Sequence, residues 1–176
     1  MKDLLKNKTI LLRALEKEDL DLLYKWENDA DIWSLSNTLI PFSKFTLKEY
    51  IESSRQDIFE AKQLRLIIQH IESGNAIGTI DLFDFDPYNL RAGIGILIAE
   101  KEDRNKGYAS ESLDAMIRYC SSVLDLKQLY CNILENNTNS LKLFISKGFV
   151  ITGTKKEWIK LKDSWMTEFF LQKILK

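Results

Sequence analysis

The sequence is poor in the residues that cross-link small proteins or bind metals. Its 176 residues include two cysteines, one histidine and two prolines. Cysteines and histidines this few argue against a zinc site, and we expect no metal. Cys120 and Cys131 both sit in apolar patterns, which indicates reduced thiols in the core. The single histidine, His70, also argues against a histidine-based catalytic triad.

Long apolar runs and a strong net charge are absent as well. No window is apolar enough for a membrane-spanning helix, and the N-terminus lacks the apolar segment of a signal peptide. The net charge is −1, so there is no overall attraction to nucleic acid or to anionic lipid. We therefore expect a cytoplasmic protein without nucleic-acid or membrane partners. The length predicts a single domain over residues 1–176.

Residues 93–109 combine a strand, a tight loop and the start of a helix. The apolar run at 94–98 has the length of a strand, and from Ser110 onward apolar residues recur at helical spacing. The loop places Gly107 at the helix start, where backbone N–H groups are free and the helix dipole is positive. Gly107 has no Cβ, and Arg104 and Lys106 add charge, so the pattern predicts a phosphate site. The alternative is an ordinary helix start with a turn glycine.

The order of predicted elements indicates an α/β fold. One strand is followed by two helices, three strands, a helix, a strand, a helix and two strands. A hairpin turn at 73–75 favours antiparallel pairing in the first half. The strand–helix–strand unit at 93–134 implies a parallel pair with a right-handed crossover. Thr46, with Glu49 three residues on, predicts the capping box of the second helix, which we expect to continue to Ile58.

Several local patterns resemble the GNAT superfamily of acetyl-CoA-dependent N-acetyltransferases. The run Arg104-x-x-Gly107-x-Ala109 resembles that family's pyrophosphate-binding loop, and residues 75–81 resemble its second hairpin. Asn137-x-x-Ser140 is similar to the start of its fourth helix, and residues 147–149 are similar to the end of that helix. The resemblance covers almost the full length. It implies a GNAT fold: a mixed, mostly antiparallel sheet of about seven strands, splayed at a central parallel pair and flanked by about four helices.

The resemblance also implies the donor, acetyl-CoA, and the residues that contact it. In the family the asparagine of the fourth helix bonds the pantetheine arm. Backbone N–H groups of the splayed strand near its end could stabilise the oxyanion that develops during transfer. We found no convincing triad, so we expect direct transfer without an acyl-enzyme. The expected donor-side residues are Leu97, Ile98, Arg104, Asn105, Lys106, Gly107, Tyr108, Ala109, Asn137 and Ser140.

Two residues depart from the family pattern. Many relatives have a glutamate at the position of Gly93 and a tyrosine at the position of Phe144, so neither acid–base role transfers. A primary amine is mostly protonated at neutral pH, so an acceptor for its proton is needed. Asp81, in mid-strand, is the candidate base, and the hydroxyl of Ser140, or water, is the candidate acid. A solvated or salt-bridged strand aspartate is the alternative for Asp81.

The acceptor is harder to identify. The opening of the chain is similar to two branches that acetylate polyamines or the N-terminal alanines of ribosomal proteins. Glu27, Asp29 and Asp31 cluster with Trp33 after the first helix, where charge and ring faces could hold a cationic amine. The alternative there is a solvated helix end. Trp158 and Trp165 are expected in the core or in a pocket wall.

We therefore expect an N-acetyltransferase acting on a primary amine, first a polyamine such as spermidine. A protein N-terminus or an amino sugar is the second acceptor class. A non-catalytic CoA-binding module is the alternative from another class, because Gly93 and Phe144 remove familiar catalytic groups. The sequence does not set the oligomeric state, and a homo-oligomer is open.

Overall fold

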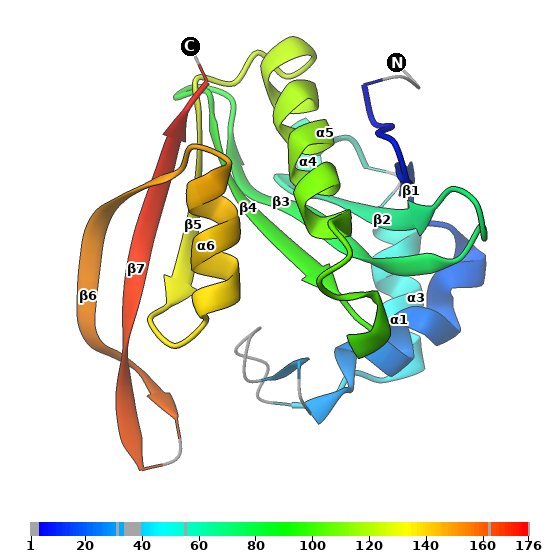
Figure 1. The fold of residues 1–176 in the computed structure, drawn as a ribbon. Helices are drawn as coiled ribbons and strands as arrows, with labels where there is room; N and C mark the ends of the chain where they lie inside the picture. The colour runs from blue at the N-terminus through cyan, green and yellow to red at the C-terminus, as the bar shows by residue number, and fades with distance from the viewer. Residues whose placement is uncertain (1–3, 31, 34–39, 55, 162, 176) are drawn as a thin grey trace.

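The computed structural model describes residues 4–30, 32–33, 40–54, 56–161 and 163–175. Its strands form one seven-stranded mixed sheet, as the sequence predicted, and their order in the sheet is β1-β2-β3-β4-β5-β7-β6 (Figure 1). All neighbouring strands are antiparallel except β4 and β5. The strands are β1 (Ile10–Ala14), β2 (Leu64–His70), β3 (Ala76–Asp86), β4 (Arg91–Ile98), β5 (Gln128–Leu134), β6 (Val150–Leu161) and β7 (Ser164–Ile174).

Five α-helices lie in the described part of the chain, together with the short 3-10 turns η1 (Lys17–Asp19) and η2 (Lys101–Asp103). The α-helices are α1 (Leu20–Glu27), α3 (Lys44–Ser53), α4 (Ile58–Ala61), α5 (Tyr108–Ser122) and α6 (Thr138–Ser146).

The start and the extent of α3 differ from the prediction. Ser43, not Thr46, is the N-cap, because its hydroxyl accepts the Thr46 N–H at 3.0 Å. The helix ends at Ser53, where serine hydroxyls bond the carbonyls of its last turn. Asp57 then caps a separate helix, α4, by accepting two backbone N–H bonds. One expected helix is therefore two.

Helices cover both faces of the sheet, and the alternation of side chains along β2 shows how. Leu66 and Ile68 point into a core shared with α5 and α6. Ile67, between them, points into a second core that contains Leu23 of α1 and Leu47 of α3. All these side chains are nearly inaccessible to water, so each helix pair is held by apolar burial against one sheet face.

The sheet splays at the β4–β5 pair, as expected. Parallel pairing covers only three residue pairs and ends at Gly93 and Tyr130. Beyond that point β4 continues to Ile98 and β5 to Leu134 without pairing to each other. Alternate backbone groups of β4 therefore face a gap rather than a neighbouring strand, and the gap is where the candidate site lies (Figure 1).

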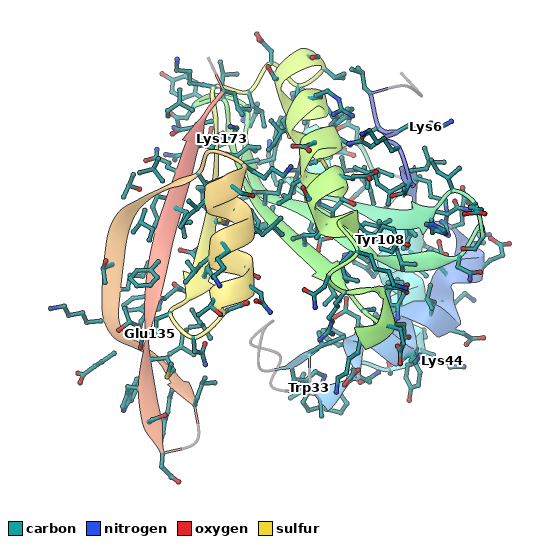
Figure 2. All side chains as sticks on the ribbon, in the orientation of Figure 1. Lys6, Trp33, Lys44, Tyr108, Glu135 and Lys173 are labelled. Atoms are coloured by element: carbon teal, nitrogen blue, oxygen red, sulfur yellow. The ribbon has the colours of Figure 1, made fainter. Side chains whose placement is uncertain are left out.

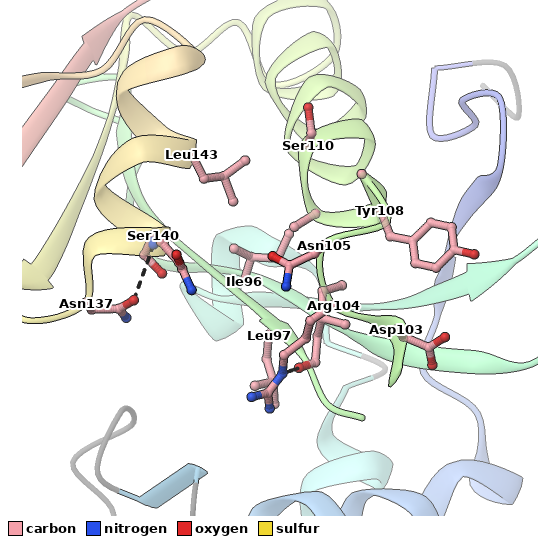
Figure 3. Close-up of a pocket in the computed structure, with 14 residues that line it drawn as sticks. Ile96, Leu97, Asp103, Arg104, Asn105, Tyr108, Ser110, Asn137, Ser140 and Leu143 are labelled. Carbon is pink, nitrogen blue, oxygen red and sulfur yellow. Dashed lines mark hydrogen bonds between the residues drawn. The ribbon is translucent and has the colours of Figure 1, made fainter. Parts of the chain in front are cut away.

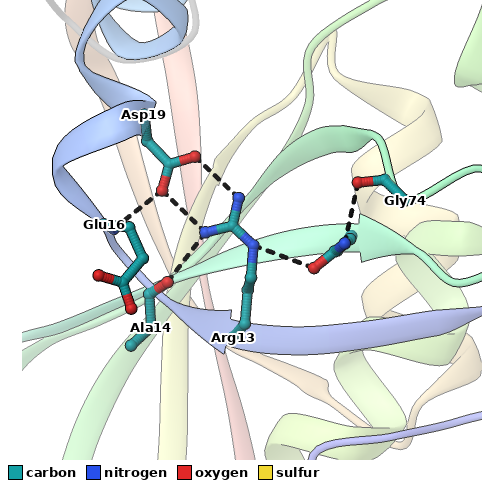
Figure 4. A network of polar contacts seen from close by, with 6 residues as sticks. Arg13, Ala14, Glu16, Asp19 and Gly74 are labelled. Carbon is teal, nitrogen blue, oxygen red and sulfur yellow. Dashed lines mark hydrogen bonds and ion pairs between the residues drawn. The ribbon is translucent and has the colours of Figure 1, made fainter.

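An arginine-centred network fixes where α1 begins (Figure 4). The Arg13 guanidinium donates two bonds of 2.8 Å to Asp19 and one of 3.0 Å to Gln69 on β2. Burial alone would raise the pKa of Asp19, but bonds from Arg13 and from the Glu16 N–H outweigh it and lower that pKa. The bidentate pair ties the helix start to the β1–β2 edge, and α1 then carries Glu27 toward the gap.

Candidate active site

One side of the gap holds a cavity of about 410 Å³ between the N-termini of α5 and α6 (Figure 3). It lies over the end of β4, on the sheet face that α5 and α6 cover. Its lining combines the predicted loop with the start of α6. The lining residues are Ile96, Leu97, Ile98, Asp103, Arg104, Asn105, Gly107, Tyr108, Ala109, Ser110, Asn137, Asn139, Ser140 and Leu143. We call it the donor cavity.

The helix start in the donor cavity depends on Gly107. This residue is the N-cap of α5 and has φ +87°, a left-handed conformation that favours glycine. A Cβ built on it would meet no atom within 4 Å, so the space beside its backbone is open. The first-turn N–H groups of a helix have no partner inside the helix and carry its positive dipole end. The geometry is therefore compatible with a diphosphate, and binding of one by this loop stays a prediction.

The two basic residues of the loop are arranged differently from each other. Arg104 lines the cavity, but its guanidinium donates to the carbonyls of Ile98 and Ala99 at 3.1 and 2.9 Å. It therefore closes the loop onto the end of β4. Lys106 does not line the cavity; it lies 3.6 Å from Asp103 in an exposed ion pair. The cationic groups of both residues therefore have partners within the protein.

Asn137 and Ser140 stand between two cavities. The Asn137 side-chain oxygen accepts the Ser140 N–H at 3.3 Å and so caps α6 (Figure 3). Both residues line the donor cavity and also a second cavity of about 480 Å³. Ile96 and Leu97 of β4 are shared in the same way, so the two cavities adjoin through the splayed gap. We call the second one the acceptor cavity.

The acceptor cavity holds a partly buried ion cluster from three elements. Arg65 of β2 donates to both carboxylate oxygens of Asp81 on β3, at 2.6 and 3.2 Å. The same guanidinium pairs with Glu27 at the end of α1 and lies over the Tyr50 ring. Burial raises the pKa of Asp81 above its ordinary value, against the opposing effect of Arg65. Glu27, Arg65 and Asp81 together carry one net negative charge at the mouth of the gap.

The sequence-predicted acceptor residues are only partly brought together. Glu27 and Asp81 line the acceptor cavity. Asp29 is exposed and does not line it, and the Trp33 indole N–H bonds the backbone carbonyl of Glu27 at 2.7 Å. Asp31 lies outside the described residues. Asp81 is in fact salt-bridged, which was the alternative stated for it, and this pairing does not remove it from the cavity.

Sequence reasoning missed Arg65 and Glu168, the other charged residues of the acceptor cavity. Arg65 lies directly opposite Asp81 in the β2–β3 register, so strand alternation was a usable signal. Glu168 comes from β7, and no local pattern places that strand near the gap. The expectation for Trp158 and Trp165 was wrong: both are more than half exposed, at 57% and 56%, on the β6–β7 hairpin.

The structure shows what surrounds the two residues that depart from the family pattern, Gly93 and Phe144. A Cβ built on Gly93 would lie 2.1 Å from the Phe83 ring, so Phe83 fills the space that a glutamate side chain would need. Phe83 itself lines the acceptor cavity. Phe144 is buried, packs edge-on against Phe149 with ring centroids 5.0 Å apart, and faces the same cavity. Aromatic rings therefore occupy both positions where acid–base groups were sought.

Other chemistry near the gap is limited. Cys131 lines the acceptor cavity, but burial raises its pKa to about 12, so its thiol stays protonated at neutral pH. Among the described residues, no three Asp, Glu, His or Cys side chains are grouped to hold a metal ion. No helix in that part of the chain is long and apolar enough to span a membrane.

Known proteins resemble this chain in sequence and in fold. The model of the acetyltransferase (GNAT) domain family matches residues 9–150. The uncharacterized N-acetyltransferase p20 of Bacillus licheniformis is 29% identical over 154 residues, covering 87% of this chain and 85% of that protein. The spermidine N(1)-acetyltransferase of Vibrio cholerae is 26% identical over 147 residues, covering 84% and 82%. A crystal structure of spermidine N-acetyltransferase from Vibrio cholerae, in complex with CoA and spermine, superposes with a TM-score of 0.86 at 22% identity, covering 96% of this chain and 97% of that one.

Proposed function

The chain belongs to the acetyltransferase (GNAT) domain family, and from that premise we propose that it acetylates a primary amine of a polyamine such as spermidine. The carboxylates of the acceptor cavity carry this proposal. Glu27, Asp81 and Glu168 line it, and Arg65 is the only cation among its lining residues in the described chain. A cavity with more carboxylates than cations favours a cationic acceptor. The relatives named for spermidine acetylation support the same acceptor class.

On the donor side, the chain binds and orients acetyl-CoA. The first turn of α5, with Gly107 at its start, would hold the diphosphate, and Asn137 would contact the pantetheine arm. Acetyl-CoA supplies the thioester whose acetyl group is transferred. Alternate backbone groups of β4 beyond Gly93 have no β5 partner, so their N–H groups are available to an oxyanion in the gap.

On the acceptor side, Asp81 would take the proton that the ammonium must lose, directly or through water. The neutral nitrogen then forms the C–N bond as the C–S bond breaks. The nitrogen passes its second proton to water or to the Ser140 hydroxyl, which gives a proton to the departing thiolate, so that the amide and free CoA thiol are formed. A pKa raised by burial suits a base, because efficiency rises as the pKa approaches the working pH. Arg65 would orient the Asp81 carboxylate, and Phe83 and Phe144 would exclude water from the transfer path.

A panel of amines tests the proposal. Release of free thiol from acetyl-CoA should accelerate most with spermidine or spermine, and less with an alanine-initiated peptide or an amino sugar. Faster release with the peptide or the amino sugar would move the acceptor to that class. Tight CoA binding with no acceleration by any amine would favour a non-catalytic CoA-binding module instead.

We extend the proposal to a homo-oligomer. A spermidine N-acetyltransferase of Vibrio cholerae has been described as a dodecamer. Here the β6–β7 hairpin exposes Val150, Trp158 and Trp165, each more than half accessible, on and beside the edge strand β6. Exposed apolar groups of this size are typical of contact surfaces. Light scattering should give a mass above 20.5 kDa, and a monomeric mass at micromolar concentration would contradict this extension.

A further inference from the structure

The charged groups of the acceptor cavity lie on opposite sides of the splayed gap. Glu27, Arg65 and Asp81 come from α1, β2 and β3, on the β4 side. Glu168 comes from β7, on the β5 side, where it pairs in register with Leu134. The surface between the two sides is largely apolar, with isoleucines of β4 and β5. The cavity therefore presents negative charge at two places separated by an apolar stretch.

Glu168 is a buried carboxylate with capacity for another partner. Its residue exposure is 8%, and its Oε2 accepts from the Lys155 ammonium at 2.9 Å. That ammonium also donates to Asn132 at 3.0 Å and lies 5.4 Å from the Trp158 ring centroid. Within the described residues no hydrogen bond reaches the Glu168 Oε1. An ionised carboxylate can accept about four bonds, so one lysine does not saturate it.

We propose that Glu168 binds a second ammonium group of the acceptor, the one that is not acetylated, and so makes the enzyme prefer diamines and polyamines to monoamines. This inference rests on the proposed polyamine acetylation and adds a specificity-determining residue to it. A polyamine carries ammonium groups separated by methylene segments, which matches two carboxylate sites joined by an apolar surface. Burial makes such a contact stronger than a surface ion pair, because water screens it less.

A substrate ammonium would compete for Glu168 with the cationic side chains that lie near it. Lys155 of β6 pairs with it directly, whereas Arg65 is already held by two carboxylates across the gap. A substrate ammonium would therefore share Glu168 with Lys155 or displace it. Removing the carboxylate and removing the lysine should then act in opposite directions on the substrate.

The test compares butylamine, 1,4-diaminobutane and spermidine as acceptors at saturating acetyl-CoA. Glu168→Gln should raise the KM for the diamine and for spermidine by roughly tenfold, or 1.4 kcal/mol, and leave that for butylamine within twofold. Glu135→Gln is the matched control. Glu135 lies just after β5 (Figure 2). Its Oε1 accepts the Thr167 N–H at 2.9 Å, and it is not among the residues that line the cavity. A glutamine keeps that bond, so this variant should behave as wild type with all three amines.

Lys155→Met separates substrate binding from a structural role. If Glu168 binds the second ammonium, removal of the competing lysine should lower the KM for spermidine severalfold. If the ion pair only supports the β6–β7 hairpin, both variants should raise the KM for all three amines, and that result would overturn the inference. An equal KM increase for butylamine and spermidine in Glu168→Gln would overturn it as well. A wild-type enzyme that acetylates none of these amines would instead refute the polyamine function itself.

Discussion

The donor and acceptor sides of the gap are built in different ways. On the donor side, Gly107 and the first turn of α5 present backbone groups from one short loop. On the acceptor side, side chains from α1, β2, β3 and β7 bring charges together from distant parts of the sequence. The donor side suits a ligand group shared by every reaction of the family. Under the proposed function, the acceptor side would distinguish one amine from another, so the two sides should respond to different substitutions.

The strongest expected effect comes from a substitution that impairs the acceptor side alone. Asp81→Asn should lower kcat/KM for spermidine by roughly 10²-fold or more, because general-base catalysis is typically worth that much. CoA affinity should not change. Asp84→Asn is the control, since Asp84 lies three residues on in the same strand, is exposed and does not line the acceptor cavity. A near-silent Asp81→Asn would place the base elsewhere.

The pH profile of the wild-type enzyme sharpens that prediction. The base must be ionised to accept a proton, so kcat/KM should fall as the pH decreases through the pKa of Asp81. Because burial raises that pKa, the fall should occur at higher pH than for an ordinary aspartate at about 3.9. The residual activity of Asp81→Asn should not show this decrease of kcat/KM at low pH. A stopped assay across the acid range would test this.

A smaller effect is expected from a substitution that impairs the donor side alone. Gly107→Ala should weaken CoA binding at least tenfold, because the new Cβ occupies the space open to the diphosphate. The positive φ should also cost about 1–2 kcal/mol of stability. Gly74→Ala is the matched control: its φ is +73° and its Cβ would meet only Gln69, at 3.8 Å. Calorimetry should find similar stability losses in both variants but weaker CoA binding only in Gly107→Ala.

A further test separates the acidic residues near the end of α1. Glu27→Gln should raise the KM for spermidine roughly fivefold, about 1 kcal/mol, and added salt should reduce the effect. Asp29→Asn should leave the KM within twofold, because Asp29 is exposed and does not line the cavity. Equal effects from the two variants would mean that long-range charge, rather than contact, attracts the amine.

The smallest expected effect concerns the missing tyrosine. Phe144→Tyr should change kcat/KM by less than threefold. A thiol leaving group, by analogy with the cysteine pKa of about 8.5, needs little help from an acid. Steady-state kinetics at several pH values would detect a difference. A large rate gain would show that protonation of the thiolate, rather than deprotonation of the amine, limits the reaction.

The donor side could be predicted from the sequence more fully than the acceptor side. The donor loop was readable because its determinants, a strand, a glycine and a helix start, are contiguous. The splayed pair followed from the resemblance and from the strand–helix–strand unit at 93–134. Local rules were less decisive for α3, where Ser43 and Thr46 both fit an N-cap and the structure uses Ser43.

The acceptor side was only partly readable because its parts meet through sheet register. Asp81 was identified, but its partner Arg65 appears only when β2 is placed opposite β3. Glu168 could be placed in the cavity only from two features of the structure. These are the position of β7 beside β5 and the gap where β4 and β5 separate. The sequence showed that Gly93 lacks a carboxylate, whereas only the structure shows that Phe83 fills that space.

Calorimetric titration of two variants with two ligands tests the separation of donor and acceptor sides most directly. CoA would be titrated into Gly107→Ala and Asp81→Asn, and spermine would then be titrated into each at saturating CoA. We expect a crossed result: Gly107→Ala loses at least tenfold in CoA affinity but binds spermine normally, and Asp81→Asn loses spermine affinity but binds CoA normally. Loss of both ligands in Asp81→Asn, or loss of spermine in CoA-saturated Gly107→Ala, would contradict the account.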